Sequence, residues 1–474
     1  MAILGFHIVL TLIAASVLQK LSARYSLGRK LLSNGLVRYL HPSTEELRTA
    51  AGHGSSGKAV RSRRRNDHSE EAEGFPVPKD AEFALETTAV RSTDILQLPF
   101  YVEYRWLVDF TLATVVVYVL SEIYMWLVSG VATNEVNLSI VWCFILIVLC
   151  LRSLSSVSAL YFRGPEDSGE RSVVLCFGAV YILMTMSLVL VADKVIDLPL
   201  SAAFHNFTSN TNQFLKAQEL ELERSTTSSA LLFLFFSVMF GVLSGMLVFP
   251  SFRYAKMYTD SLSFASPLQK VLIHAGFFSP LLALVLWLRP VADHLVFAEP
   301  RPLLSHAQLE SVRMWALVFV AFVRLLTARV HLQAYLNLAH RKVASLKSES
   351  GRINSLDLQR MIGRIFMYVC VTAVQYFVPV IIILALTMIT KTLGSYSWLT
   401  PFGLPELRLP FLSTSFFHPK VFSKSDLGAS LASVYSLFSC TVNRGVFGFI
   451  LLTTVFVSFS LNLIGVLYNT RFAK

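Results

Sequence analysis

The chain has 474 residues, of which 54% are hydrophobic and only 15% are charged. A typical soluble domain has about 45–50% apolar and about 25% charged residues, so this composition excludes an ordinary soluble domain. The formal net charge of +11 does not indicate nucleic-acid binding, because basic residues of a multi-span protein gather in cytoplasmic loops beside anionic lipid.

Nine apolar segments are long enough to cross a hydrocarbon core about 30 Å thick. The sequence therefore predicts an all-α, polytopic helical membrane protein, with spans at residues 2–18, 106–128, 138–160, 173–192, 230–249, 271–288, 311–328, 365–390 and 446–468. The first segment, in residues 1–19, is either an anchor or a cleaved signal peptide, which would leave eight spans. No basic residue precedes it, and Lys20 and Arg24 follow it, which favours the anchor.

The distribution of basic residues predicts the orientation in the membrane. With nine spans and an outer or lumenal N-terminus, most of the 41 Lys and Arg residues fall in cytoplasmic segments, as the positive-inside rule requires. The same arrangement places the sequon that begins at Asn206 in an outer loop, residues 193–229, where it can accept a glycan. We therefore expect a cytoplasmic C-terminus, in either the plasma membrane or the endomembrane system.

The segment at 20–105 is polar and predicts a partly disordered cytoplasmic linker before the membrane bundle of spans 2–7 at 106–328. Its middle, from Gly52 to Lys79, has few large apolar residues and cannot bury a core. The basic run from Arg61 to Arg65 has the pattern of a nuclear localisation signal. In a protein fixed in a bilayer, attraction to anionic lipid or to a soluble partner is the favoured interpretation.

Two further connections are long enough to hold structure outside the membrane. Apolar residues recur near the helical period from Leu325 to Leu346, which predicts a basic cytoplasmic helical hairpin at 329–364. Gly351 is expected to end its first helix, and Asn354 or Ser355 to cap its second. Within the last section, 365–474, the outer loop 391–444 holds four prolines, so we expect an irregular cap over the spans.

Ionisable residues inside predicted spans are the sharpest candidates for a functional site, namely Asp109, Glu122, Arg152, His274 and Arg324. A lone ion at mid-bilayer costs at least about 2.5–3.5 kcal/mol, so such groups are expected to face protein or water. Asp109, Arg152 and Arg324 all lie near the cytoplasmic ends of their spans, which predicts an ion pair of Asp109 with Arg152 or Arg324. Depth along the helices also predicts an outer pair of Glu122 with Arg313. These pairs either fix helix register or belong to an ion or proton pathway, and His274 is expected to be a packing residue.

Two prolines and a pair of glycines within the predicted spans are further candidates for a structural or functional role. Pro280 and Pro379 lie inside predicted spans and each removes a helical hydrogen bond, which predicts a kink and a freed carbonyl. Such breaks occur at transporter binding sites and also in ordinary membrane helices. Gly241 and Gly245 form a GxxxG pair that predicts a close helix crossing, within the protein or in a dimer.

Enzyme motifs are not found in the sequence. It has no P-loop, GxSxG, HExxH or CxxC arrangement, and this predicts no catalytic residues, no metal and no cofactor. The five cysteines do not suggest a disulfide framework, because all except Cys440 lie in apolar runs.

Several short segments carry a resemblance that runs in order along most of the chain. They include WLVDF at 106–110, GERSV at 169–173, HLQAYLNLA at 331–339 and KTLGSYSW at 391–398. On these segments the chain resembles the metazoan transmembrane protein 161 family, whose vertebrate members are called A and B, and is similar to both as a divergent member. The resemblance implies a non-enzymatic multi-pass protein. It also implies protection against oxidative stress, DNA damage and apoptosis, as for the A member, or restraint of ionic currents, as for the B member.

The sequence thus favours a multi-pass protein that modulates membrane ion currents or stress responses through protein partners such as ion channels. The alternative is a transporter or channel that moves an ion or small solute through the bundle. A conduit requires the intramembrane charges to line a wet cavity at mid-depth, whereas a modulator can bury them in pairs or leave them at interfaces.

Overall fold

The computed structural model describes residues 6–50, 75–78, 84–127, 137–163, 168–217, 229–296, 303–348, 353–402 and 437–472. Eight of the described helices are long and apolar enough to cross a membrane. They are α6 (Tyr101–Leu127), α7 (Ser139–Arg163), α8 (Ser168–Val195), α10 (Ser229–Ser261), α11 (Pro267–Val285), α13 (His306–Leu336), α16 (Val369–Leu393) and α18 (Cys440–Arg471). The predicted all-α, multi-span architecture is confirmed.

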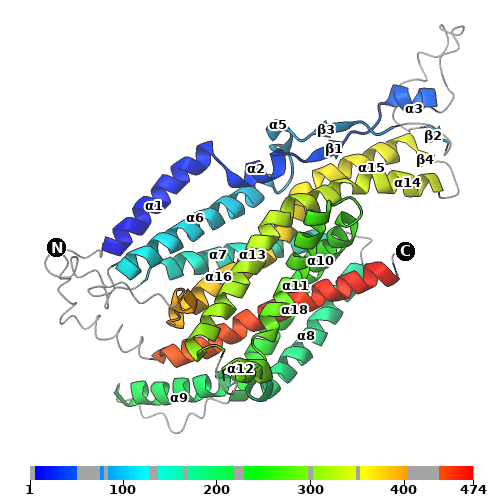
Figure 1. The fold of residues 1–474 in the computed structure, drawn as a ribbon. Helices are drawn as coiled ribbons and strands as arrows, with labels where there is room; N and C mark the ends of the chain where they lie inside the picture. Colours follow the sequence, from blue (N-terminus) through cyan, green and yellow to red (C-terminus); the bar gives the residue numbers. More distant parts are fainter. Residues whose placement is uncertain are drawn as a thin grey trace, which may run out of the picture.

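Helix α1 (Phe6–Arg24) covers most of the first predicted span and packs along α6, antiparallel to it (Figure 1). It is not among the eight helices, so a ninth span at the N-terminus remains a prediction. A turn at Tyr25 and Ser26 joins α1 to the short helix α2 (Leu27–Ser33), whose first turn is capped by the Ser26 hydroxyl.

Helix α16 is the centre of the bundle, because 83% of the residues in its most apolar 18-residue stretch are buried. It contacts α6, α7, α10, α13 and α18. Helices α8 and α7 lie at the periphery, where only 17% and 28% of the residues in the corresponding stretches are buried. An apolar side chain on an outer helix loses nothing by facing lipid, so only the central helix needs neighbours on every side. The other seven spans are therefore arranged unevenly around α16.

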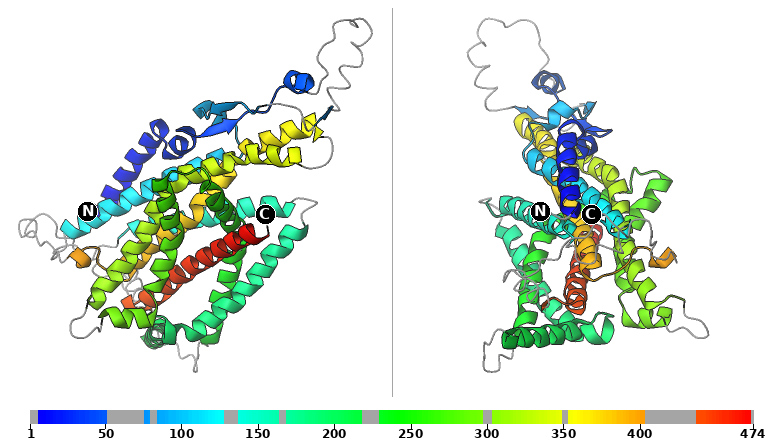
Figure 2. Two further views of the ribbon diagram at one scale, coloured as in Figure 1. Left: turned by 45° about the vertical axis from the view of Figure 1, so that its right-hand side comes forward. Right: turned by 90° about the vertical axis from the view of Figure 1, so that its left-hand side faces the viewer.

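The two ends of the bundle carry different structures (Figures 1 and 2). One end, which we call the hairpin end, carries α14 (Leu338–Ser348), α15 (Ser355–Met367) and the C-terminus of α18. The opposite end, which we call the α9 end, carries α9 (Leu200–Ala217), α12 (Arg289–Val296) and the short 3₁₀ helix η1 (Thr400–Phe402). Helix α9 lies across the ends of the spans.

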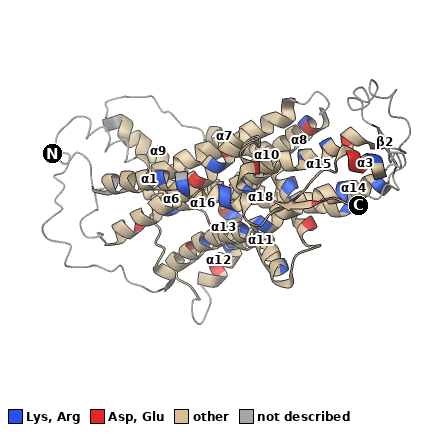
Figure 3. Ribbon diagram, turned by 90° about the horizontal axis from the view of Figure 1, so that it is seen from above, with Lys and Arg blue, Asp and Glu red and all other residues tan. Residues whose placement is uncertain are grey.

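The predicted hairpin is present as α14 and α15, which contact each other beyond α13. The Asn354 side chain caps α15 by accepting from the amide of Leu356, as predicted, and Gly351 lies outside the described residues. Many of the Lys, Arg, Asp and Glu residues gather around α3 (Thr44–Ala50), α14 and α15, whereas the spans are mostly uncharged (Figure 3).

The segment at 20–105 is more ordered than the sequence predicted. Strand β1 (Val37–Tyr39) pairs antiparallel with β3 (Thr87–Ala89), and β2 (Pro76–Val77) pairs antiparallel with β4 (Ile353–Asn354). The short helix α5 (Ser92–Ile95) follows β3. Leu47 and Val77 are buried in one apolar cluster with Val343 and Leu358 of the hairpin. This cluster supplies the apolar partners that the polar segment lacks by itself. Most of 52–79, for which disorder was predicted, lies outside the described residues.

Candidate functional site

Asp109 of α6 binds residues on both sides of the turn between α1 and α2. Its carboxylate accepts from the Ser22 hydroxyl at 2.9 Å and from the Gly28 amide at 3.2 Å. Arg105 lies one helical turn earlier, with its Nε 3.6 Å from the same carboxylate. The predicted pairing with Arg152 or Arg324 is therefore wrong, because the partners are Arg105 of α6 itself and Ser22 and Gly28 of the segment before it.

Glu122 forms an ion pair with Lys391, not with Arg313. Helix α16 extends past the predicted end of its span as far as Leu393, which brings Lys391 level with Glu122. The Lys391 ammonium also lies 5.9 Å from the centroid of the Trp398 ring. This pair closes the α9 end of the interface between α6 and α16.

Arg313, the predicted partner of Glu122, is completely buried at the start of α13. It donates to the carboxylates of Asp197 and Glu310, each at 2.7 Å, and to the Leu286 carbonyl at 3.0 Å. The ring of His306 and these two carboxylates lie within 4.8 Å of one another, a grouping with metal-ligand atoms. Arg313 bridges both carboxylates, and its single positive charge offsets one of their two negative charges.

Two other predicted residues lie at the surface of the bundle. Arg152 is exposed on α7, and no carboxylate in the described part of the chain forms an ion pair with it. His274 is exposed on α11, and its Nδ1 shares a hydrogen bond of 2.8 Å with the Tyr258 hydroxyl. Neither side chain joins the interior cluster described next.

Arg324 is the buried cation of the bundle interior, with 6% of its surface exposed. Its guanidinium carbon lies 3.5 Å from the centroid of the Tyr254 ring, a cation–π contact between α13 and α10. Its Nε donates to the Gly276 carbonyl on α11 at 3.1 Å. No described carboxylate forms an ion pair with Arg324, so a ring face and a carbonyl dipole take the place of a counter-ion.

The acceptor of Arg324 is available because of Pro280. Proline has no amide hydrogen, so the carbonyl four residues earlier in the helix, that of Gly276, receives no bond from position 280. Arg324 supplies the missing donor. Pro280 and Pro379 both lie inside helices, as predicted, and Pro250 lies inside α10, which continues past the predicted end of that span.

These three prolines meet around one small cavity. It has a volume of about 20 Å³ and is lined by Pro250, Pro280, Pro379, Arg324 and residues of α18 among others. A void of that size holds about one water molecule. The hydroxyl of Tyr254 and the Oε1 of Gln375 belong to residues that also line it, and neither atom has a hydrogen-bond partner among the described residues.

Aromatic residues that were not predicted complete the cluster. His331 is completely buried between the rings of Tyr254 and Tyr376, at centroid distances of 5.2 and 5.4 Å, and its Nδ1 bonds to the Thr327 carbonyl. The Tyr376 hydroxyl donates to the Arg324 carbonyl at 2.6 Å. The sequence predicts a helix through this segment, but periodicity alone does not show which of its residues the neighbouring helices cover, so the burial of His331 was not predicted.

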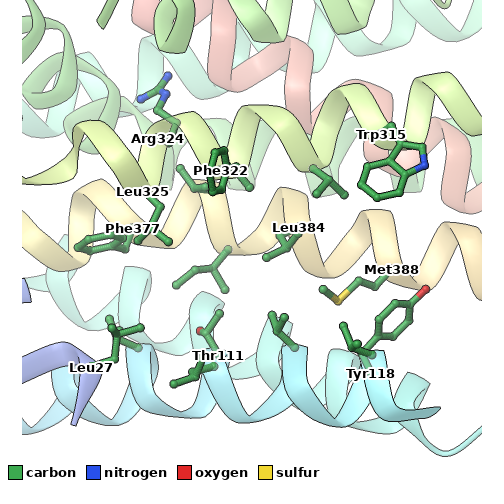
Figure 4. A pocket seen from close by; sticks show the side chains of 18 of the residues that line it. Leu27, Thr111, Tyr118, Trp315, Phe322, Arg324, Leu325, Phe377, Leu384 and Met388 are labelled. Atoms are coloured by element: carbon green, nitrogen blue, oxygen red, sulfur yellow. The ribbon is translucent and has the colours of Figure 1, made fainter. Parts of the chain in front are cut away.

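A larger groove lies on the other side of α13 (Figure 4). It has a volume of about 690 Å³, and its walls come from α6, α13 and α16, with side chains such as Tyr118, Phe322 and Leu384. Most of its lining side chains are apolar, and Thr111, Glu122 and Arg324 are also among its lining residues. The guanidinium of Arg324 points to the side of α13 away from this groove.

The predicted GxxxG crossing is between α10 and α8. A Cβ on Gly241 would lie 2.3 Å from Ile182 Cγ1, and one on Gly245 would lie 3.3 Å from Val174 Cγ1. The close approach predicted by this pair is thus within the chain. Asn206, the predicted glycan site, lies in α9 and is partly exposed.

Together, the eight spans and the buried polar interior define an all-α, polytopic integral membrane protein. The family model described as predicted transmembrane protein 161AB matches residues 2–473, so the chain belongs to this family. No solved structure matches the chain.

Proposed function

We propose that this protein is a non-enzymatic modulator of membrane ion currents and of the cellular response to oxidative stress, DNA damage and apoptotic signals, acting through protein partners. The observation that carries the proposal is that three of the charged side chains within the spans are bound by neighbouring residues. Asp109 and Glu122 are engaged by neighbouring residues, and Arg324 is held by Tyr254 and Gly276. Charges held in this way fix helix register.

The cavities support the same conclusion. The void beside Arg324 has room for about one water, and the 690 Å³ groove is walled mostly by apolar side chains, although Glu122 and Arg324 are among its lining residues. An ion crossing a bilayer needs a continuous polar or hydrated path, because the bare charge is strongly disfavoured in hydrocarbon. Neither cavity offers one in the described part of the chain.

Transport of an ion or small solute is the second candidate, and one observation favours it. Pro250, Pro280 and Pro379 each remove a hydrogen bond inside a helix around the buried Arg324, and transporters use helix breaks at their binding sites.

The two candidates differ in whether the purified chain conducts by itself. The full chain is reconstituted in liposomes that contain dyes for H⁺, K⁺, Na⁺ and Cl⁻, and flux is compared with protein-free liposomes. The modulator proposal expects equal flux. It also expects that, in cells from which the protein is removed, whole-cell current density and survival in peroxide change and return with the wild-type chain. Flux that requires the protein and falls on Arg324→Gln would establish transport instead.

A further inference from the structure

The small cavity beside Arg324 carries a net positive charge. It is enclosed by α10, α11, α13, α16 and α18, and among the described residues that line it Arg324 is the only charged one. The guanidinium points away from the larger groove (Figure 4) and toward α10 and α11, where its contacts with Tyr254 and Gly276 lie. The volume of about 20 Å³ suits one water molecule or one monatomic ion of similar size.

Arg324 is only partly engaged by the protein. A guanidinium has five N–H donors. The Nε of Arg324 donates to the Gly276 carbonyl, but its two Nη atoms, which carry the other four hydrogens, donate to no acceptor among the described residues. The Tyr254 ring covers a face of the guanidinium and leaves the N–H bonds, which lie in the guanidinium plane, free to donate. Buried charges in proteins are normally paired, so this cation lacks a counter-ion.

Two serines that line the cavity keep their hydroxyl hydrogens available. A buried serine in a helix often donates to a carbonyl three or four residues earlier, as Ser237, Ser244 and Ser460 do here. Ser251 of α10 and Ser458 of α18 are only 3% and 9% exposed, yet neither side chain makes a hydrogen bond in the described part of the chain. The two helices thus bring unused hydroxyl donors to the same cavity.

Two more lining residues have buried polar groups without partners. Asn462 of α18 is 4% exposed, and its amide makes no hydrogen bond to a described residue. The Tyr254 hydroxyl is also buried and unpartnered among the described residues. Both groups can donate, and an unsatisfied polar group inside a membrane is costly. A neutral water would satisfy some of these donors but would leave the charge of Arg324 uncompensated, and a metal cation would be repelled by it.

Gln375 also lines the cavity, and its unpartnered atom is an oxygen that an anion would repel. Its Nε2 donates to the Tyr161 hydroxyl at 3.1 Å. The oxygen and nitrogen of an amide occupy nearly the same space, so their order follows from the hydrogen bonds that they can make. With the amide turned over, the Tyr161 hydroxyl donates to Oε1, and Nε2 becomes a further donor beside the cavity. Gln375 is then compatible with an anion.

We propose that this cavity binds a chloride ion, which accepts from the Nη atoms of Arg324 and from the hydroxyls of Ser251 and Ser458. The small volume excludes phosphates, carboxylates and other polyatomic anions. The ion is the counter-ion that Arg324 lacks within the described chain, and it links α10, α13 and α18 beside the three prolines. A bound counter-ion needs no path across the membrane, so the site does not depend on whether the protein modulates currents or transports a solute.

Thermal unfolding of the purified full chain in detergent tests the proposal, with sodium chloride exchanged for sodium gluconate at constant ionic strength. A ligand that binds only the folded state stabilises it, so the melting temperature should rise with chloride and then saturate. Sodium bromide should act in the same way, because bromide is also monatomic. Equilibrium dialysis with radioactive chloride should show a single bound ion per chain. A melting temperature independent of chloride, with no bound chloride, would overturn the proposal.

Variants of the lining residues locate the ion. Ser251→Ala and Ser458→Ala should each weaken chloride binding about tenfold, through the loss of one hydrogen bond to a charged group. Ser237→Ala is the matched control, because Ser237 is completely buried in α10 but bonds to the Phe233 carbonyl and does not line the cavity. Its affinity for chloride should equal that of the wild type.

Arg324→Met should abolish both the bound chloride and the dependence of the melting temperature on chloride. If this variant does not fold, the two serine variants decide the question. Chloride that still binds to folded Arg324→Met, or binds with wild-type affinity to both serine variants, would place the ion elsewhere and contradict the proposal. Elution volume in size-exclusion chromatography establishes that each variant is folded.

Discussion

Arg324 donates through its Nε to the carbonyl of Gly276, 3.1 Å away, which Pro280 leaves without its helical donor. Arg324 of α13 therefore supplies the hydrogen bond that Pro280 removes from α11. Removal of either one changes the bonding of the other.

A double-mutant cycle tests this dependence. Arg324→Met removes the donor and leaves the Gly276 carbonyl buried and unpaired. Pro280→Ala restores an amide hydrogen that can bond to it, so Pro280→Ala should be more favourable in the Arg324→Met background than in the wild type. The expected coupling is about 0.6 kcal/mol and at most about 1.7 kcal/mol, the range measured for hydrogen bonds inside membranes. Equal effects of Pro280→Ala on unfolding in both backgrounds would show that the two residues are independent.

Asp109→Ala is expected to loosen α1 and α2 from the bundle. The change leaves the Gly28 amide and the Ser22 hydroxyl without their common acceptor, and a buried unpaired polar group costs about 1–3 kcal/mol. Thermal unfolding followed by size-exclusion chromatography should show a lower midpoint. Arg105→Gln, which alters a cation whose side chain is 37% exposed, should have a smaller effect.

The rescue experiment separates the observed partners of Asp109 from those first predicted. Because Arg152 and Arg324 do not contact Asp109, adding Arg152→Gln or Arg324→Gln to Asp109→Ala should restore neither expression nor melting temperature. Recovery with either second change would mean that the carboxylate pairs across the bundle and not with the corner of α1 and α2.

The sequence predicts the spans better than it predicts the contacts between them. Hydropathy depends on the local chain alone, so the eight long helices were located, and Pro280 and Pro379 were placed inside helices. Ion pairing depends on which helices are neighbours and on where each helix ends. Lys391 was assigned to a loop because its span was predicted to end at Thr390, and the span at 230–249 was likewise ended one residue before Pro250, although both helices continue.

The segment before α6 shows the other limit. Its polarity predicts a linker, and short strands such as β1 and β2 are too brief to give an alternating pattern. Their partners, β3 and β4, lie far along the chain or within a turn, and Leu47 is buried only because the hairpin of α14 and α15 covers it. When a segment far along the chain buries a residue, the sequence around that residue shows no hydrophobic pattern that would predict the burial.

The orientation of the chain gives a prediction that can be tested in cells. Because Asn206 lies partly exposed in α9, and α9 and the hairpin occupy opposite ends, a glycan on Asn206 requires a cytoplasmic hairpin. A glycosidase-sensitive mobility shift should be lost on Asn206→Gln. An epitope tag inserted within 52–79 should be reached by antibody only after permeabilisation. Labelling of that tag on intact cells would reverse the proposed orientation.

The crossing of α10 and α8 gives the clearest steric prediction. A methyl group on Gly241 would lie 2.3 Å from Ile182 Cγ1 and 3.1 Å from the Gly178 carbonyl oxygen, distances at which a neighbour must move. Gly241→Ala should therefore lower the melting temperature, and Ile182→Ala should recover part of the loss by making room. Gly363→Ala is the control, because a Cβ there meets nothing within 4 Å and alanine favours a helix by about 0.8–1.0 kcal/mol. Its melting temperature should stay the same or rise. If Gly241→Ala melts like the wild type, the two helices do not pack as closely as described.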